Sequence, residues 1–474
     1  MSYELPFNPD IFREYDIRGI ADRDLADPVV ESLGRAFGRY LAPAGAQTVA
    51  VGYDARLSSP RLRDAVARGL ISEGLDVIDL GLCPTPALYF SLYHLNTGAG
   101  IMITGSHNPA DFNGFKLCVG KDTIFGEEIQ KLRMVMESMP KTAEARRGTL
   151  SRHPIMPDYI SYLKSAFPAV TDAPLTVVVD AGNGTAGLAA PVVLAGMGCT
   201  VIELYSEPDG RFPNHHPDPT IPKNLEALIR TVKEHRADLG IAFDGDADRI
   251  GIVDEEGNIL WGDQLMVLFS RDILAERPGA TFVSEVKCSQ TMYDDIRSHG
   301  GNAIMWKTGH SLIKAKMKET KAALAGEMSG HLFFADRYFG YDDAIYAACR
   351  AVELLQRTRK RSGAADRFGS LIADLPKTCS TPEIRFDCPD AIKFRVVERM
   401  QEVFQHGSRL PLPPREVITV DGVRAVFEKG WGLIRASNTQ PVLVMRFEAG
   451  DRDALRQIRQ MMEEQVQQAI RSLS

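Results

Sequence analysis

The strongest constraint on the fold is an order of β-rich runs that occurs three times along the chain. The first set lies at 48–54, 77–81 and 100–103, the second at 176–180, 201–205 and 238–243, and the third at 281–284, 303–306 and 322–325. Each third run leads into a polar loop, and return runs follow the loops at 114–119, 250–253 and 332–335. Short β-rich runs that alternate with longer helical stretches predict βαβ units and mostly parallel sheets.

The three polar loops have the sequences TGSHN, DGDADR and GEMSGH. In open α/β sheets, ligands bind outside the carboxyl ends of the strands, so loops in three equivalent positions are expected to face one shared cleft. Strand-like apolar runs are common in any α/β protein, and coincidence is the alternative explanation. The order of the runs and the place of the loop agree three times, which favours a repeat.

A chain of 474 residues exceeds what one hydrophobic core usually supports, which indicates several domains. The pattern lapses in the charged, proline-rich stretch 140–158 and again at 357–382. Further runs then lie at 383–386, 416–420, 424–428, 432–435 and 442–447, before a final helix at 451–472. We therefore predict an α/β protein with three similar mixed α/β domains with mostly parallel sheets, at 1–153, 154–256 and 257–372. A C-terminal α+β domain with an antiparallel sheet follows at 373–474, and all four surround a central cleft.

The composition argues against several classes of protein. The formal net charge of −7 disfavours a nucleic-acid-binding surface. No apolar stretch approaches the roughly 20 residues that span a bilayer, and the longest, 187–198, is predicted to be a buried helix. The seven cysteines are widely spaced without a CxxC motif, which predicts reduced thiols in the cytoplasm rather than disulfides or structural zinc. The acidic, proline-containing N-terminus does not resemble a secretory signal.

The loop DGDADR places Asp244, Asp246 and Asp248 directly after an apolar run. Alternate residues of an extended turn can converge on one hard cation, and Mg²⁺ prefers oxygen ligands. An EF-hand does not fit, because Arg249 stands where that loop needs glycine and the flanking runs are strands. A solvated acidic turn is the other explanation, but three aspartates after a buried strand would repel one another without a cation. The sequence therefore predicts a site for one Mg²⁺ per chain.

Ser106 and His107 follow the apolar run 100–103. A serine needs activation or prior modification to act as a nucleophile, and position 108 is Asn, so the G-x-S-x-G elbow of esterases is absent. A capped turn, with Pro109 fixing its start, is an equally good explanation of this loop alone. Lys116, on the return run, either neutralises a phosphate or solvates an edge strand.

Two more loops carry groups suited to a sugar phosphate. In GEMSGH, the carboxylate of Glu327 can accept hydrogen bonds from hydroxyl groups. RASNTQP suits an anion nest, although it is not a Walker loop; its polar residues are Arg435, Ser437, Asn438 and Thr439. Either loop, taken singly, is also compatible with an ordinary polar turn.

Taken together, YDIRG, TGSHNP, DGDADR, GEMSGH and RASNT occur in the order typical of the α-D-phosphohexomutase family, which the chain resembles over nearly its whole length. The stretch WKTGHSLIK at 306–314 is most similar to the bacterial phosphomannomutase/phosphoglucomutase branch. The resemblance implies Mg²⁺ and a phosphorylated serine in the resting enzyme. It also implies reversible phosphoryl transfer between positions 1 and 6 of mannose or glucose phosphates, through a hexose 1,6-bisphosphate that also serves as activator.

The resemblance assigns roles to individual residues. Ser106 is the phosphoserine and joins Asp244, Asp246 and Asp248 at the metal. Proton transfer belongs among His107, Lys116 and Arg249, which the sequence does not rank. The expected substrate contacts are Tyr15, Arg18, Lys287, His310, Glu327, Ser329, His331, Arg435, Ser437, Asn438 and Thr439.

By these roles, each of the four predicted domains carries one loop. In chain order, these are the phosphoserine loop, the metal loop, the sugar-binding loop and the phosphate-binding loop. Within this set, Arg435, Ser437, Asn438 and Thr439 are expected to hold the phosphate that does not react. The expected partners are hexose phosphates, with no nucleic acid and no membrane, and the chain is expected to be a cytoplasmic monomer.

Three other functions stay open on the sequence. A phosphoglucosamine mutase is the nearest alternative, although Met328 and Asn438 resemble the mannose/glucose branch. A Mg²⁺-dependent sugar phosphatase would use Asp244 as its nucleophile. A non-catalytic sugar-phosphate-binding protein would bind without isomerisation, and the intact Ser106 and aspartates speak against it.

Overall fold

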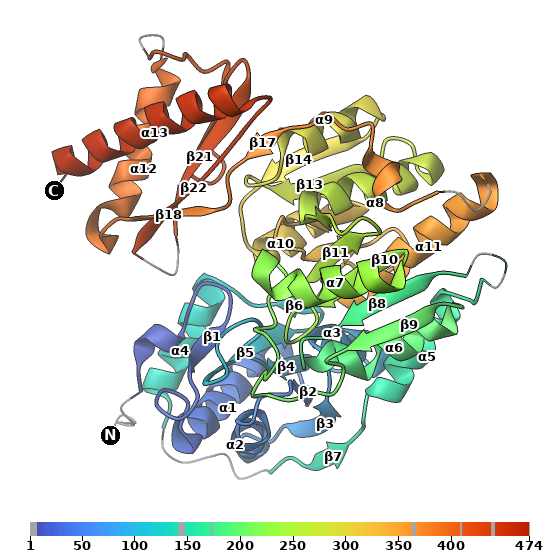
Figure 1. The fold of residues 1–474 in the computed structure, drawn as a ribbon. Coiled ribbons are helices and arrows are strands. Elements are labelled where there is room, and N and C mark those ends of the chain that lie inside the picture. The colour runs from blue at the N-terminus through green and yellow to red at the C-terminus, as the bar shows by residue number, and fades with distance from the viewer. Residues whose placement is uncertain are drawn as a thin grey trace. The chain divides into compact units, whose positions relative to one another are not determined.

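The computed structural model describes residues 7–140, 147–170, 172, 174–362, 366–407, 410–437 and 441–473. These residues form two compact units. The first contains the described residues up to Leu265 together with Ser329–Leu371, and the second contains Met266–Met328 together with the described residues from Ile372 onward. Figure 1 labels the elements along the chain.

The first sheet follows the path β1-β5-β4-β2-β3-β7, with β6 paired to β5. Its strands are β1 (Ile17–Ile20), β2 (Thr48–Tyr53), β3 (Asp76–Leu82), β4 (Ala99–Ile103), β5 (Phe112–Val119), β6 (Asp122–Thr123) and β7 (Leu150–Arg152). The associated helices are α1 (Asp27–Leu41), α2 (Ser59–Ser72), α3 (Thr85–His94) and α4 (Glu127–Ser138). Strands β4, β2, β3 and β7 are parallel, whereas β5 runs antiparallel to β4 and β1. Val51 and Ile101 pack with Phe37 and Leu70 in the core under α1 and α2.

The second sheet has the order β12-β11-β10-β8-β9. Its strands are β8 (Thr176–Asp180), β9 (Thr200–Leu204), β10 (Leu239–Phe243), β11 (Ile250–Asp254) and β12 (Ile259–Leu260). The helices are α5 (Met156–Ala166), α6 (Ala190–Gly196) and α7 (Glu226–His235). Val178 and Ala242 form a buried cluster with Leu228 and Val232 of α7. The predicted helix at 187–198 is shorter than expected, because a 3₁₀ turn precedes it at Thr185–Leu188 and Pro191 stands in the first turn of α6.

The third sheet has the order β14-β13-β15-β16. Its strands are β13 (Thr281–Glu285), β14 (Asn302–Trp306), β15 (Leu324–Gly326) and β16 (Leu332–Phe334). The helices are α8 (Gly262–Glu276), α9 (Gln290–Ser298), α10 (His310–Thr320) and α11 (Ala344–Ser362). Strand β13 runs parallel to both β14 and β15.

The three sheets share one topology, which confirms the repeat. In each, the strand order runs from the return strand to the third strand of the set, then the first, then the second: β5-β4-β2-β3, β11-β10-β8-β9 and β16-β15-β13-β14. The polar loop therefore leaves the same strand of each sheet. The fold class predicted from the sequence is confirmed for these mixed, mostly parallel sheets.

The fourth sheet has the order β17-β22-β21-β20-β19, with β18 also paired to β22, and it is antiparallel. Its strands are β17 (Cys379–Ser380), β18 (Ile384–Asp387), β19 (Glu416–Ile418), β20 (Val423–Val426), β21 (Gly430–Ala436) and β22 (Val442–Ala449). Helices α12 (Asp390–Gln405) and α13 (Arg452–Leu473) lie side by side against this sheet (Figure 1). Ile434, Met445 and Phe447 pack beneath them. The predicted C-terminal α+β domain type is confirmed.

Two details differ from the sequence-based expectation. Helix α11 continues to Ser362, so the predicted lapse at 357–382 begins inside a helix rather than in a linker. The short strands β1, β6, β7, β12 and β17 were not predicted, because strands of two to four residues depend on a neighbouring strand more than on their own pattern.

All seven cysteines are free. Among the described residues, no helix combines the length and the apolar character needed to cross a bilayer.

Candidate active site

In the first unit, the loop after β4 holds Ser106 in an unusual backbone conformation. Strand β4 is buried throughout, and Ser106 has a φ of +47°, in the left-handed region that few non-glycine residues adopt. The Ser106 N–H donates to Thr104 Oγ1 at 2.8 Å, and Thr104 Oγ1 and the Gly105 N–H both donate to Asp54 Oδ2. Such strain persists only where the surroundings enforce it, and it is common at functional sites.

Arg56 anchors the rest of this loop. Its guanidinium, 1% exposed, donates to four backbone carbonyl oxygens at 2.5–2.9 Å: those of Ser106, Asn108, Pro109 and Phe112. It also pairs with Asp54 at 3.2 Å. A Cβ at position 105 would lie 2.5 Å from the guanidinium carbon, so this position has to be glycine. The loop is therefore fixed by the residues that follow β2, the strand next to β4.

The metal-loop prediction can be tested on the side chains that follow β10. Asp244, Asp246 and Asp248 are at most 1% exposed, and each offers a carboxylate oxygen within 4.8 Å of the other two. Among the described residues, Asp246 Oδ1 is buried without a hydrogen-bond partner. A buried, all-oxygen set with an unsatisfied acceptor fits a small hard cation.

Lys116 reaches the metal loop from β5. Its Nζ contacts Asp246 Oδ2 at 2.7 Å and also contacts Asp248 Oδ2. Burial alone lowers the pKa of Lys116, but the two carboxylates outweigh burial and raise this pKa well above its usual value. Thr85 Oγ1 donates to the same Asp246 oxygen at 2.5 Å. Lys116 is therefore a fixed positive charge at the metal loop, which excludes its role as the solvator of an edge strand.

The serine loop and the metal loop are joined by a hydrogen bond. Ser106 Oγ donates to Asp244 Oδ2 at 2.8 Å, and it lies 3.1 Å from His107 Nδ1. Burial, together with the neighbouring carboxylates Asp246 and Asp248, raises the pKa of Asp244 well above its usual value. Burial, followed by the positive charges of Arg249 and Arg18, lowers the pKa of His107 well below its usual value.

Two more predicted residues complete this cluster. Arg249 Nε donates to His331 Nε2 at 3.0 Å, and His331 Nδ1 lies 3.1 Å from Asp342 Oδ2 and 3.6 Å from Asp248 Oδ1. On the opposite side of the serine loop, Arg18 of β1 donates to the side-chain oxygen of Asn108 at 3.0 Å.

In the second unit, carboxylates surround the predicted Lys287. Lys287 Nζ lies 3.5 Å from Glu285 and 3.4 Å from Glu383. Burial lowers the pKa of Lys287, but these acids, with Glu327, outweigh burial and raise it. Glu327 in turn accepts a hydrogen bond at 2.6 Å from the N–H of Gly309, immediately before α10.

Arg435 is held in the same unit by a shared acid. Asp421 Oδ2 accepts from Arg435 Nε and from the Thr308 N–H, both at 3.0 Å. His310 is the first residue of α10, and Ser437 is buried at the end of β21. The predicted residues Asn438 and Thr439 lie outside the described residues.

The structure thus gathers the predicted residues into two sets. The set in the first unit comprises Arg18, Ser106, His107, Lys116, Asp244, Asp246, Asp248, Arg249 and His331. The set in the second unit comprises Lys287, Glu327 and Arg435, with His310 and Ser437 on adjoining elements. Tyr15 and Ser329, both half-buried, belong to the first unit.

Several residues at these sites were not found from the sequence. They are Asp54, Arg56, Thr85, Glu285, Asp342 and Asp421. Asp54 and Arg56 follow β2, and the serine loop follows β4, which is the neighbour of β2 in the sheet. The predicted strand order could therefore have indicated that these residues lie close to the serine loop. Thr85 lies 161 residues from Asp246, and no local pattern marked Thr85, Asp342 or Asp421.

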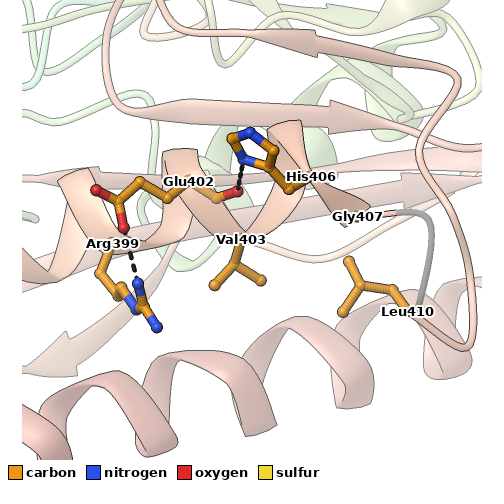
Figure 2. Close-up of a pocket in the computed structure, with 6 residues that line it drawn as sticks. All are labelled: Arg399, Glu402, Val403, His406, Gly407 and Leu410. Atoms are coloured by element: carbon orange, nitrogen blue, oxygen red, sulfur yellow. Dashed lines mark hydrogen bonds and ion pairs between the residues drawn. The ribbon is translucent and has the colours of Figure 1, made fainter.

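A surface hollow of about 520 Å³ elsewhere in the second unit contains none of the predicted residues (Figure 2). Arg399, Glu402, Val403, His406, Gly407 and Leu410 line it. Its polar groups satisfy one another, since Arg399 pairs with Glu402 at 2.8 Å and the Glu402 carbonyl oxygen lies 3.0 Å from His406 Nδ1. This hollow is not a candidate site.

Comparison with known proteins divides the chain into four domains of one family. The models of phosphoglucomutase/phosphomannomutase alpha/beta/alpha domains I, II and III match residues 9–142, 157–257 and 261–369, and the model of the family's C-terminal domain matches 383–465. The exact domain boundaries predicted from the sequence stay predictions.

Whole-chain relatives agree with these matches. A phosphomannomutase/phosphoglucomutase of Pseudomonas aeruginosa is 44% identical over 98% of this chain and 96% of its own. A phosphoglucomutase of Neisseria gonorrhoeae is 42% identical over 95% of each. A crystal structure of a phosphoglucomutase/phosphomannomutase family protein from Burkholderia thailandensis superposes with a TM-score of 0.89 at 38% identity, over 98% of both chains.

Proposed function

Because the chain belongs to the phosphoglucomutase/phosphomannomutase family, we propose that it is a phosphohexomutase that moves a phosphoryl group between positions 1 and 6 of mannose and glucose phosphates. The observation that carries the proposal is the 2.8 Å contact between Ser106 Oγ and Asp244, in a loop held by Arg56. It places a presented serine beside a buried acidic triad, which is what a phosphoserine and its counter-ion require.

Charge explains why the triad belongs beside the serine. A phosphoserine carries about −1.5 to −2 charge, and three nearby carboxylates would repel it strongly. Asp244, Asp246 and Asp248, with the phosphate of Ser106, would hold the Mg²⁺. When bound, Mg²⁺ neutralises this cluster and withdraws charge from the transferring group. Lys116 and Arg249 supply further positive charge from the protein itself.

In the proposed reaction, phosphorylated Ser106 donates the phosphoryl group. The bond between phosphorus and Ser106 Oγ breaks and a bond forms to the free hydroxyl oxygen of a hexose monophosphate. The hydroxyl proton passes to a basic group beside the serine, and Ser106 Oγ takes up a proton from an acidic group there, which restores the serine hydroxyl. The product is a hexose 1,6-bisphosphate. With the sugar turned end for end, its other phosphate returns to Ser106 and leaves the isomeric monophosphate. Separate substitution of His107, Lys116 and Arg249 identifies which group takes the proton from the sugar and which group gives one to Ser106.

The remaining predicted residues bind the sugar phosphate. Arg435 and Ser437, with Asn438 and Thr439, hold the phosphate that does not react. Glu327 and Ser329 accept and donate hydrogen bonds with the sugar hydroxyls. The other proposed substrate contacts are Tyr15, Arg18, Lys287, His310 and His331. The proposal includes one Mg²⁺ per chain, a hexose 1,6-bisphosphate activator, a monomer and a cytoplasmic location, the last supported by the free cysteines.

The decisive test is the phosphorylation state of Ser106. Mass spectrometry of the tryptic peptide that contains Ser106 is expected to show phosphate, and Ser106→Ala is expected to lower kcat at least about a thousand-fold. Ser72→Ala, on α2, is the matched control. Full turnover by Ser106→Ala would contradict the mechanism, and loss of phosphoenzyme in Asp244→Asn alone would point to the phosphatase alternative.

Substrate preference needs a second measurement. The kcat/KM values for mannose 1-phosphate, glucose 1-phosphate and glucosamine 6-phosphate, with catalytic glucose 1,6-bisphosphate present, are expected to favour the first two. Faster turnover of glucosamine 6-phosphate would make the chain a phosphoglucosamine mutase.

A further inference from the structure

The C-terminal sheet has two buried faces of opposite character. The face under α12 and α13 is apolar and includes Ile434 and Met445. The register places Arg424, Leu433 and Arg446 in one row across β20, β21 and β22, on the other face. Arg424 is 0% exposed and Arg446 6% exposed, so two cations are buried on this second face.

The loop that follows β13 covers this face. Arg424 Nη1 donates to the carbonyl oxygens of Val286, at 2.5 Å, and Cys288, at 2.7 Å. Arg446 Nη1 donates to the carbonyl oxygen of Lys287, at 2.7 Å. Three consecutive backbone carbonyls are therefore bound by two arginines from a different sheet. Trp431 and Leu433 pack against the Val286 side chain between them.

The next residues of the loop are anchored by the same sheet. Glu448 Oε1 accepts from Ser289 Oγ at 2.8 Å, from the Gln290 N–H at 3.3 Å and from Trp431 Nε1 at 2.9 Å. The contacts run without a break from residue 286 to residue 290, so the C-terminal sheet determines the path of the loop.

The burial of Arg424 indicates that this side chain does more than stabilise the fold. Burial lowers its pKa to about 10, so it stays charged at neutral pH, and its guanidinium carbon lies 3.7 Å from the centre of the Trp431 ring. A buried charge is costly unless its donors are satisfied, and well-packed apolar residues often stabilise a fold as well or better. Arginine does what an apolar side chain cannot, since it fixes the backbone on both sides of Lys287.

The same sheet also carries Arg435. Arg435 lies two residues after Leu433 on β21, so both side chains point to the same face. We propose that Arg424 and Arg446 are positioning residues, which fix Lys287 relative to Arg435 so that the two cations bind one hexose phosphate as a unit. This inference rests on the proposed function, because it takes Lys287 and Arg435 as substrate contacts.

The first experiment compares Arg424→Met and Arg424→Lys with Met445→Ala, a buried substitution on the opposite face. Arg424→Met is expected to raise the KM for mannose 1-phosphate and glucose 1-phosphate roughly ten- to a hundred-fold, with kcat at saturating substrate changed less than about three-fold. Arg424→Lys is expected to recover part of the loss, because one carbonyl can still be bound. Met445→Ala is expected to lower Tm and leave KM unchanged.

The second experiment asks whether Arg424 acts through Lys287. In a Lys287→Met background, Arg424→Met is expected to change kcat/KM by less than about two-fold, because the positioned group is already absent. The proposal would be overturned if the effects of Lys287→Met and Arg424→Met on kcat/KM multiplied in the double variant. It would also be overturned if Met445→Ala raised KM as much as Arg424→Met does.

If Arg424→Met does not fold, Arg446→Met replaces it in both experiments, alone and in the Lys287→Met background. Absence of mutase turnover in the unsubstituted chain would contradict the proposed function. An active chain whose KM is insensitive to both arginines would contradict only this inference.

Discussion

The Ser106 loop and the Lys287 loop are both held by buried arginines that donate to backbone carbonyls, but the arginines come from different parts of the chain. Arg56 lies just beyond β2, which pairs with β4, the strand that leads into the Ser106 loop. Arg424 and Arg446 lie on β20 and β22, about 140 and 160 residues beyond the loop they hold. One anchor belongs to the sheet of its loop, and the other belongs to another sheet.

This difference separates two tasks. The serine loop carries the atom that we propose to react, and its backbone is anchored from within its own βαβ sheet. The Lys287 loop is tied to the sheet that carries Arg435, so its geometry follows the residues that we propose to bind the phosphate. Damage to the first anchor is therefore expected to change kcat, and damage to the second to change KM.

The largest effect is expected from Arg56→Met. It removes the guanidinium donor from four loop carbonyls and deprives Asp54, which is 2% exposed, of its ion-pair partner. We expect kcat to fall about a thousand-fold and the free energy of unfolding to fall by about 3–5 kcal/mol, measured by steady-state kinetics and urea denaturation. The control Arg68→Met, at an exposed ion pair with Glu31, is expected to change stability by less than about 0.5 kcal/mol. A pure KM effect of Arg56→Met would break the comparison.

The next largest effect is expected from Asp246→Asn. This change removes one carboxylate from the triad and one partner of Lys116. Mg²⁺ affinity and kcat are expected to fall about a hundred-fold, while KM for the hexose phosphate stays close to its original value. Titration of the rate with Mg²⁺ and calorimetry measure the two parts, with Asp209→Asn, at a half-buried ion pair with Arg211, as control. An unchanged Mg²⁺ requirement would contradict the metal assignment.

A smaller effect, on stability alone, is expected from Asp343→Asn in the first unit. Asp343 accepts hydrogen bonds from the hydroxyl groups of Tyr159 and Tyr338, and burial raises its pKa to about 6, from an ordinary value of 3.8. The folded state therefore holds this proton more tightly than the unfolded state. The resulting stability is fully present below about pH 4 and is lost as pH rises through about 6.

The shift corresponds to about 3 kcal/mol, since each pKa unit is worth about 1.4 kcal/mol. Urea denaturation at intervals from pH 4 to pH 7 is expected to show this fall in the unsubstituted chain and not in Asp343→Asn. The KM for hexose phosphates is expected to stay unchanged, because the hydroxyl groups that Asp343 binds belong to Tyr159 and Tyr338, neither of which is a proposed substrate contact. The same pH dependence in both proteins would show that another group is responsible.

The smallest effect is expected from Arg399→Ala, in the hollow of the second unit (Figure 2). Its ion pair with Glu402 is exposed at both ends, so the free energy of unfolding is expected to change by less than about 0.5 kcal/mol. Neither kcat nor KM is expected to change. A KM effect here would mean that the proposed phosphate-binding site extends beyond the anchored face of the C-terminal sheet.

The sequence predicted the repeat and the loops well because both depend on local patterns. The runs that end at Ile103 and Phe243 are buried strands, and their polar loops follow where expected. Ser106 and Asp244 lie 138 residues apart, yet the shared strand order was enough to predict that their loops are equivalent. The return strands were predicted for the same reason.

The sequence did not predict the residues that hold the loops. A buried arginine such as Arg424, in the run VRAV, has the same local pattern as an exposed one on an edge strand. The lapse expected from Arg357 onward begins inside α11 for a similar reason, because that helix is stabilised by packing on its apolar side whatever the charge of its last turn.

By itself, then, the sequence determined the succession of strands, the three equivalent loops and the chemistry that those loops carry, because periodicity and residue type are local properties. Only the tertiary structure decided which charges are buried together. Lys116 between Asp246 and Asp248, Arg56 beneath Ser106, and Arg424 beneath Lys287 are pairings across 50 to more than 130 residues. A buried charge is tolerated only where folding brings its partner to it, and that condition is not written in any local stretch of sequence.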